Sequence, residues 1–227
     1  MKDLLFLHGA IGAESQFQPL QNVLKDRFNI HTLNFSGHGG KTMHDAFSIE
    51  QFASEVLAYL DSNNIATIRI FGYSMGGYVA LYLAKFHSER INGIFTLATK
   101  LDWTPEIAER ETKMLNADKI AEKIPAFAAE LKRRHEPNDW RIVLQKTTEM
   151  MVGLGNRNPL QLEDFKTIEN PIRIAIGDKD AMVSLEETIA VYRNLPNASF
   201  IVLPDTQHPI EKVDVQRLAD ELGLYFS

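Results

Sequence analysis

The chain has 227 residues, a net charge of −6 and no cysteine. Its 44% hydrophobic and 24% charged residues are typical of a folded globular chain, and they exclude extended disorder. The lack of cysteine excludes disulfides, thiolate metal sites and cysteine nucleophiles, and it fits a cytoplasmic protein. The acidic balance argues against nucleic acid as a partner, because phosphate binding needs a basic face. The opening apolar run is too short for a signal peptide, and no window reaches the roughly 20 apolar residues of a membrane helix. We therefore expect no membrane partner.

Six short apolar runs, taken in chain order, are predicted to form strands. They are Leu4–Leu7, Ile30–Phe35, Ile68–Phe71, Ile91–Leu97, Ile172–Ile176 and Phe200–Leu203. Most of them are continuous rather than alternating, which is typical of parallel strands covered on both faces. Helical patterns lie between them at Phe17–Phe28, Ile49–Leu60 (with Ser48 as N-cap), Tyr78–Phe86, Thr188–Leu195 and Val213–Leu222. The alternation predicts an α/β fold with a mostly parallel, doubly wound sheet of about six strands.

The alternation stops between Lys100 and Lys166, where only helical patterns are found. The predicted helices are roughly Thr104–Ala117, Lys119–Arg134 and Asn138–Leu154, with breaks near Pro125, Pro137 and Gly153–Gly155. Such an insertion lies at the carboxyl edge of the strands, where ligands bind in open α/β sheets. We interpret it as a cap over a site rather than as a solvated appendage.

The segment Gly72–Gly77 (GYSMGG) follows the predicted strand Ile68–Phe71 and precedes a helix. It has the pattern G-x-S-x-G in a setting where a sharp turn lifts a serine hydroxyl above the sheet. Gly72 and Gly76 are expected where neighbouring chain passes close to the turn. The amino end of the following helix would favour a developing oxyanion. We predict that Ser74 is a nucleophile, although glycine-rich turns of this kind also occur without catalysis.

A tetrahedral intermediate needs two amide donors for its oxyanion. The predicted donors are the backbone amides of Met75, directly after Ser74, and of Ala10, in the turn that follows the first strand. Their side chains would shape the pocket and do no chemistry. His8, in the same turn, is interpreted as support for the loop backbone.

A serine nucleophile also needs a base that takes its proton and a carboxylate that orients the base. His208 follows the last predicted strand and is the only histidine beyond His135, so we predict that it is the base. Three aspartates at the same sheet edge are candidates for the acid: Asp178, Asp180 and Asp205. Asp178 could instead bond the backbone amides of its turn, and Asp205 could orient the histidine loop.

Four features in this order resemble the α/β-hydrolase family. His8–Gly9 resembles its oxyanion turn, Ser36–Gly39 its glycine-histidine-glycine turn, and Gly72–Gly77 its nucleophile turn. Gly177–Val183, with His208–Pro209, resembles its acid turn and histidine loop. The order of the four is more specific than G-x-S-x-G alone.

The resemblance implies a core of residues 1–99 and 167–227 and a helical cap of residues 100–166. It places the acid at Asp180, so the expected triad is Ser74, Asp180 and His208. It implies no metal and no organic cofactor. The sequence departs from the family pattern in two places. The first predicted strand already carries the oxyanion turn, so two strands of longer members have no counterpart here. Asn34–Ser36 stands where many relatives have an aspartate and a proline.

The function expected from these residues is hydrolysis of a small carboxylic ester or thioester through an acyl-serine intermediate. The expected partner is a small-molecule substrate, and the expected state is a monomer or homodimer. Two alternatives stay open. One is a non-ester member of the same family, similar to carbon–carbon bond hydrolases or to a lyase of menaquinone synthesis. The other is a ligand-binding sensor that keeps the triad.

Basic residues gather in the predicted cap. They are Lys132, Arg133, Arg134, Arg141, Lys146 and Arg157. We interpret them as a solvated helix face. The alternative is recognition of a carboxylate or phosphate on the substrate, and basic side chains that face Ser74 would favour the non-ester enzyme.

Overall fold

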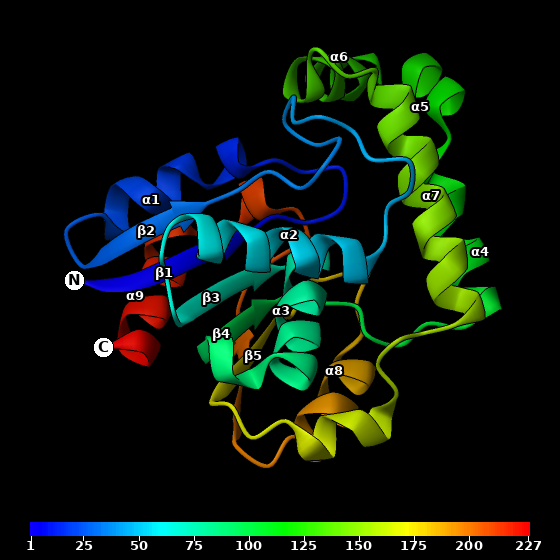
Figure 1. The fold of residues 1–227 in the computed structure, drawn as a ribbon. Coiled ribbons are helices and arrows are strands. Elements are labelled where there is room, and N and C mark those ends of the chain that lie inside the picture. Colours follow the sequence, from blue (N-terminus) through cyan, green and yellow to red (C-terminus); the bar gives the residue numbers. More distant parts are fainter.

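Six parallel strands form one sheet in the computed structural model, which describes residues 1–227 (Figure 1). The strands are β1 (Lys2–Leu7), β2 (Phe28–Thr32), β3 (Ile68–Tyr73), β4 (Ile91–Leu97), β5 (Ile172–Gly177) and β6 (Ala198–Leu203). Their order across the sheet is β2-β1-β3-β4-β5-β6, and every neighbouring pair is parallel. The predicted fold class and the six predicted strands are confirmed.

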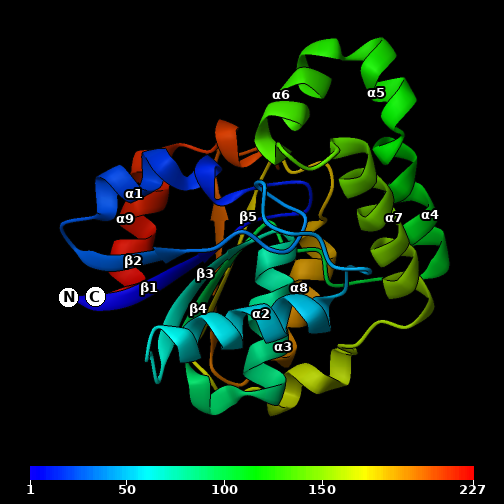
Figure 2. The same cartoon turned by 45° about the horizontal axis from the view of Figure 1, so that its top comes forward.

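Helices cover both faces of the sheet (Figure 2). One face carries α2 (Ile49–Ser62), α3 (Met75–Phe86) and α8 (Leu185–Asn194), and the other carries α1 (Gln18–Leu24) and α9 (Val215–Phe226). Successive strand residues serve the two cores in turn, because side chains alternate along a strand. In β1, Leu5 and Leu7 belong to the first core, whereas Leu4 and Phe6 belong to the second.

Two predicted elements near the amino end have different bounds in the structure. The strand predicted at Ile30–Phe35 is β2, which starts at Phe28 and ends at Thr32. Its last predicted residue, Phe35, is buried because it stacks on Phe52 in the first core, with ring centroids 4.6 Å apart. The helix predicted at Phe17–Phe28 ends at Leu24, since Phe28 already pairs with β1. Phe28 and Phe35 are both buried, as their apolar character indicated, but Phe28 lies in a strand and Phe35 lies in a loop.

The helical insertion, residues 100–166, contains four α-helices at one side of the sheet (Figure 1). They are α4 (Pro105–Thr112), α5 (Ala117–Lys123), α6 (Pro125–His135) and α7 (Trp140–Asn156). The predicted breaks at Pro125 and Pro137 are confirmed.

Two details of the insertion differ from prediction. Asn116 starts a separate helix because its side chain accepts a hydrogen bond from the Lys119 amide, at 2.8 Å, so Ala117 belongs to α5. The predicted break at Gly153–Gly155 is wrong, because α7 continues to Asn156. Gly155 instead allows α4 to approach, since a Cβ there would lie 2.6 Å from the Cβ of Ala108.

The parallel arrangement brings the carboxyl ends of β1, β3, β5 and β6 to one edge of the sheet. The loops that follow these four strands carry the predicted site residues. None of the helices combines the length and the apolar character needed to cross a bilayer.

Candidate active site

The turn between β3 and α3 holds Ser74 in a strained conformation. Its φ of 52° and ψ of −118° lie in a region that residues other than glycine rarely occupy. The turn is tightly surrounded, because a Cβ on Gly72 would lie 2.5 Å from the Cα of Gly77 and one on Gly76 would lie 2.2 Å from the Leu7 carbonyl oxygen. The predicted close approach at these glycines is confirmed. Backbone strain that surrounding structure enforces is a feature of functional sites.

His208 lies between Ser74 and Asp180. Its Nε2 is 3.3 Å from the Ser74 Oγ, and its Nδ1 is 2.8 Å from the Asp180 Oδ2. A carboxylate accepts, so Nδ1 carries the proton and Nε2 is free to accept from the serine hydroxyl. The three predicted residues therefore form one hydrogen-bonded series.

The side chain of Asp180 is buried, and both of its carboxylate oxygens accept hydrogen bonds. Its Oδ1 accepts hydrogen bonds from the Met182 and Val183 amides, at 2.8 and 2.9 Å. Burial opposes ionisation, but the hydrogen bonds from His208 and from these amides outweigh it, so the pKa of the Asp180 carboxyl lies below its usual value. The carboxylate form that orients an imidazole is thus favoured.

The other two candidate acids lie elsewhere. Asp178 accepts a hydrogen bond from the Thr206 amide, at 3.1 Å, which matches the expected alternative role in fixing its turn. Asp205 is exposed and forms an ion pair with Lys179. Neither forms a hydrogen bond or ion pair with His208.

Tyr73 is a residue that the sequence interpretation missed. Its hydroxyl donates to the backbone carbonyl of His208, at 2.9 Å, and burial raises its pKa well above the ordinary value. It occupies the variable position of G-x-S-x-G, so no signal in a single sequence distinguishes it.

The two predicted amide donors lie beside the serine. Met75 is the first residue of α3, whose amide has no acceptor within its own helix. Ala10 lies in the turn after β1, and its amide donates to no backbone or side-chain acceptor in the protein. His8 is buried, donates from Nδ1 to the Gly9 carbonyl at 2.8 Å, and accepts at Nε2 from the Phe35 amide at 3.2 Å. It supports the loop backbone, as interpreted.

An apolar pocket opens above Ser74 and is lined by core and insertion alike. The lining residues are Ala10, Ile49, Ser74, Met75, Tyr78, Lys100, Trp103, Glu111, Met150, Met151, Leu154, Met182, Val183 and His208. The insertion thus supplies part of the wall next to the serine.

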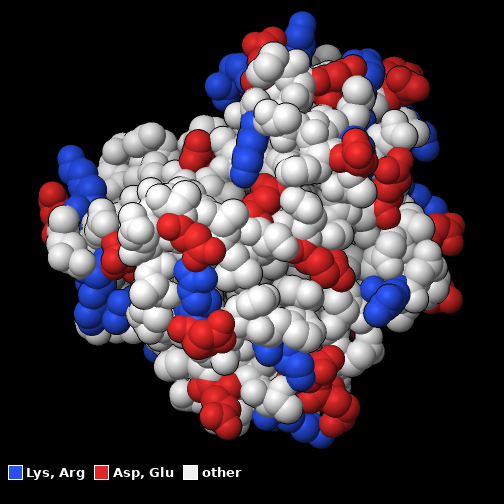
Figure 3. Space-filling view, in the orientation of Figure 1, with Lys and Arg blue, Asp and Glu red and all other residues white.

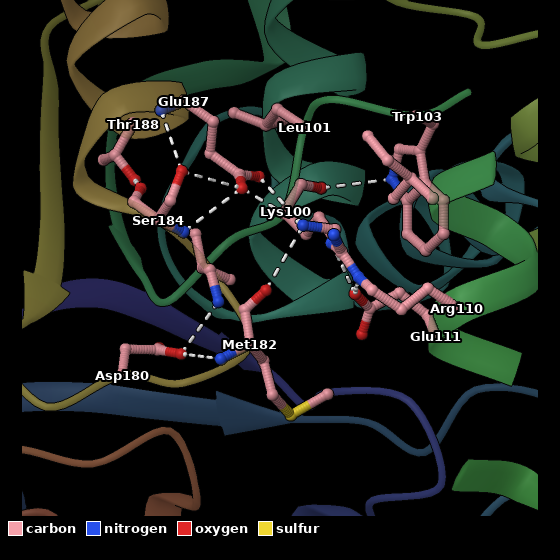
Figure 4. A network of polar contacts seen from close by, with 12 residues as sticks. Lys100, Leu101, Trp103, Arg110, Glu111, Asp180, Met182, Ser184, Glu187 and Thr188 are labelled. Atoms are coloured by element: carbon pink, nitrogen blue, oxygen red, sulfur yellow. Dashed lines mark hydrogen bonds and ion pairs between the residues drawn. The ribbon is translucent and has the colours of Figure 1, made fainter. Parts of the chain in front are cut away.

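Polar contacts link one side of this pocket to the Asp180 loop (Figure 4). Lys100 Nζ donates to the Met182 carbonyl at 3.2 Å and pairs with Glu187 at 3.1 Å. Glu187 in turn accepts from the Ser184 amide at 3.1 Å. The loop that follows Asp180 is therefore held from the start of the insertion and from α8.

The six basic residues singled out in the sequence of the insertion lie away from the Ser74 pocket, whereas Lys100, at the start of the insertion, lines it. None of the six lines the pocket, and the face in Figure 3 shows acidic and basic side chains interspersed. Arg133 is a surface residue, as interpreted, but Arg134 is not, because only 8% of its side chain is exposed. No group of three or more histidine or acidic side chains is arranged to hold a metal ion.

Residues 3–139, more than half of the chain, match the family described as the alpha/beta hydrolase fold. The chain belongs to the α/β-hydrolase family. The resemblance drawn from its motifs is confirmed, and the family together with the esterase names of the relatives described next indicates a hydrolase enzyme.

Related sequences are named pimeloyl-acyl-carrier-protein methyl ester esterase. The protein of Neisseria meningitidis serogroup C is 23% identical over 229 residues, which cover 92% of this chain and 87% of that protein. The protein of Vibrio cholerae is 30% identical over 98 residues, which cover 43% of this chain and 37% of that protein.

Solved structures share the fold. The enol-lactonase from Burkholderia xenovorans LB400 superposes with a TM-score of 0.80 at 18% identity, covering 99% of this chain and 91% of that one. A thermophilic esterase from Thermogutta terrifontis gives 0.75 at 22% identity, covering 100% and 89%.

Proposed function

We propose that the protein hydrolyses a carboxylic ester or thioester through an acyl intermediate on Ser74. The observation that carries the proposal is the hydrogen-bonded series from Ser74 through His208 to Asp180. The Ser74 end of this series lies at an apolar pocket. The names of the related esterases support ester chemistry.

In the first half of the reaction, the Ser74 Oγ attacks the carbonyl carbon and its proton passes to Nε2 of His208. The carbonyl π electrons move to oxygen, and Asp180 stabilises the imidazolium that forms. The intermediate collapses when the bond to the leaving alcohol or thiol breaks, and His208 gives its proton to that group. Water then attacks the acyl-serine with the same proton transfers, which releases the acid and restores the hydroxyl.

The amides of Ala10 and Met75 are the proposed donors to the oxyanion. Both belong to the pocket wall beside Ser74, and neither has a partner in its own turn or helix. Donors held in place before the reaction stabilise negative charge without reorganisation, and in many enzymes this stabilisation accounts for most of the rate enhancement.

The substrate is proposed to be a small molecule with an apolar acyl group, and residues 100–166 to act as a cap over it. Met150, Met151 and Leu154 come from α7 and form apolar wall near Ser74. Methionine side chains adapt to different acyl shapes. Methyl esters of acyl chains are therefore candidates, in keeping with the names of the relatives.

The test combines turnover with covalent labelling. Wild type is assayed with p-nitrophenyl esters of two to twelve carbons and with methyl esters, and its intact mass is recorded after a fluorophosphonate probe. We expect ester turnover and one label at Ser74. Ser74→Ala should lose both, whereas the exposed Ser54→Ala should keep both.

Three outcomes would contradict parts of the proposal. Turnover of Ser74→Ala within threefold of wild type would exclude the nucleophile. Labelling without turnover of any ester would move the function to a non-ester reaction of the same serine. No labelling of wild type would mean that the serine is not activated and would favour a sensor.

A further inference from the structure

The turn that carries Ala10 contains an unusual residue. The Gly12 amide donates to the Gly9 carbonyl at 3.0 Å, which closes a four-residue turn, and Ile11 is its third residue. Ile11 has a φ of 52°, a left-handed conformation that such turns normally assign to glycine or asparagine. A β-branched side chain is especially disfavoured there. A strained residue of this kind persists only where its surroundings impose the conformation.

Ile11 packs partly against the main core, and the helical insertion supplies the rest of its surroundings. Its carbonyl oxygen accepts two hydrogen bonds from the last turn of α6: from His135 Nε2 at 3.1 Å and from Arg134 Nη1 at 3.2 Å. Its side chain packs against the small apolar cluster of the insertion, which consists of Ile120, Leu131, Trp140 and Leu144. Figure 2 shows the end of α6 beside the loop that follows β1. Backbone and side chain of Ile11 are thus both held by the insertion.

Arg134 and His135 are themselves fixed. Arg134 also pairs with Glu211 at 3.0 Å, in the turn just after His208. His135 is fully buried and accepts at Nδ1 from the Gly39 amide at 3.2 Å. The pair therefore joins the Ile11 turn to the histidine loop and to the turn after β2.

We infer that Arg134 and His135 are positioning residues, which hold the Ile11 turn so that the preceding Ala10 amide is presented beside Ser74. This inference rests on the proposed function. The two side chains do not line the pocket, and their contact with the Ile11 turn is to its backbone carbonyl. The insertion then has a second role besides lining the pocket, because the oxyanion site is complete only while α6 is docked on the Ile11 turn.

The first variants are Arg134→Met, which keeps the packing of the aliphatic stem, and Arg133→Met as control. Arg133 lies in the same helical turn, but 71% of its side chain is exposed and it pairs only with Glu130. The second pair is His135→Leu, which loses both hydrogen bonds, and His135→Gln, whose amide can donate and accept. Each is assayed for kcat and KM with a p-nitrophenyl ester, and for Ki of a trifluoromethyl ketone, whose serine adduct carries an oxyanion.

We expect Arg134→Met and His135→Leu to lower kcat on the order of 10- to 100-fold, since removal of one whole oxyanion donor costs roughly 10²–10³. KM should stay within threefold, and Ki of the ketone should rise in parallel with the loss of kcat. The pH profile of kcat/KM should keep its acid limb, because His208 and Asp180 are untouched. Arg133→Met should match wild type, and His135→Gln should recover most of kcat.

The inference is overturned if Arg134→Met keeps kcat within threefold, if Arg133→Met loses as much, or if only KM changes. Arg134→Met decides the matter alone if His135→Leu does not fold. Fluorophosphonate labelling of wild type separates failure of this inference from failure of the proposed function. If wild type is labelled and the variants are unaffected, only this inference is overturned. If wild type is not labelled, the proposed function is overturned and this inference with it.

Discussion

His208 is held through both its side chain and its backbone. Its imidazole Nδ1 binds Asp180, and its backbone carbonyl accepts from the Tyr73 hydroxyl. The first contact sets the tautomer and the second sets the position of the loop. A general base needs the correct tautomer and the correct position, because it must accept the proton of the serine hydroxyl along a single hydrogen bond.

The three neighbouring aspartates should differ sharply when their charge is removed. Asp180→Asn loses the carboxylate that binds His208, and by analogy with other triads kcat should fall on the order of 10⁴. Asp178→Asn and Asp205→Asn should keep kcat/KM within about tenfold, since neither side chain forms a hydrogen bond or ion pair with the histidine. Steady-state kinetics with one ester checks this. A severe loss in Asp205→Asn would show that the acid is assigned wrongly.

Tyr73→Phe tests the second contact. The His208 carbonyl would be left buried without a partner, which costs about 1–3 kcal/mol. We expect the free energy of unfolding in urea to fall by this amount and kcat to fall with KM nearly unchanged. An unchanged unfolding curve would mean that the carbonyl finds another donor.

At the scale of elements, α7 contains two glycines with opposite surroundings. Gly153 is exposed, and a Cβ there would have no atom within 4 Å, whereas a Cβ on Gly155 would lie 2.6 Å from Ala108 of α4 and 2.8 Å from the Thr104 carbonyl. Only the second glycine is required by packing. The first weakens the helix through its backbone entropy.

Gly153→Ala should therefore raise the free energy of unfolding by about 0.5–1 kcal/mol. Gly155→Ala should lower it by about 1–3 kcal/mol, because α4 must move away from α7. Urea unfolding of the two variants beside wild type measures both. Equal effects of the same sign would show that α4 does not pack closely on α7.

At the scale of the whole molecule, three buried histidines lie where β1, the turn after β2 and α6 meet. The rings of His8 and His38 are 5.1 Å apart, and those of His38 and His135 are 5.6 Å apart. Burial is the main cause that lowers the pKa of His8 and of His135 to about 4, and the pKa of His38 lies well below 6.5 for the same reason. The folded protein thus keeps all three neutral under conditions where an unfolded chain protonates them.

Acid should destabilise the fold through these histidines. Between pH 6.5 and about 4 these histidines bind protons in the unfolded chain but stay neutral in the folded protein. The free energy of unfolding therefore decreases as the pH is lowered through this window. Each histidine contributes a slope of about 1.4 kcal/mol per pH unit. In His38→Gln the slope should be shallower than in wild type, measured by urea unfolding from pH 7 to 4.5. Identical slopes would exclude His38 as a contributor.

Much of this architecture could be predicted from local sequence pattern. Apolar runs indicated the six strands, and the position of Pro125 and Pro137 indicated where insertion helices end. The glycines around Ser74 indicated a tight turn, and the atoms that surround them are the reason. Periodicity and turn chemistry are properties of neighbouring residues, so one sequence contains them.

Other features were decided only by tertiary structure. Among three aspartates at the same sheet edge, the family resemblance singled out Asp180, and tertiary packing is what brings its carboxylate to His208. Tyr73 meets a carbonyl 135 residues away, and His135 meets the Ile11 carbonyl 124 residues away. Contacts over such separations depend on how whole elements pack, and no local pattern in the chain encodes them.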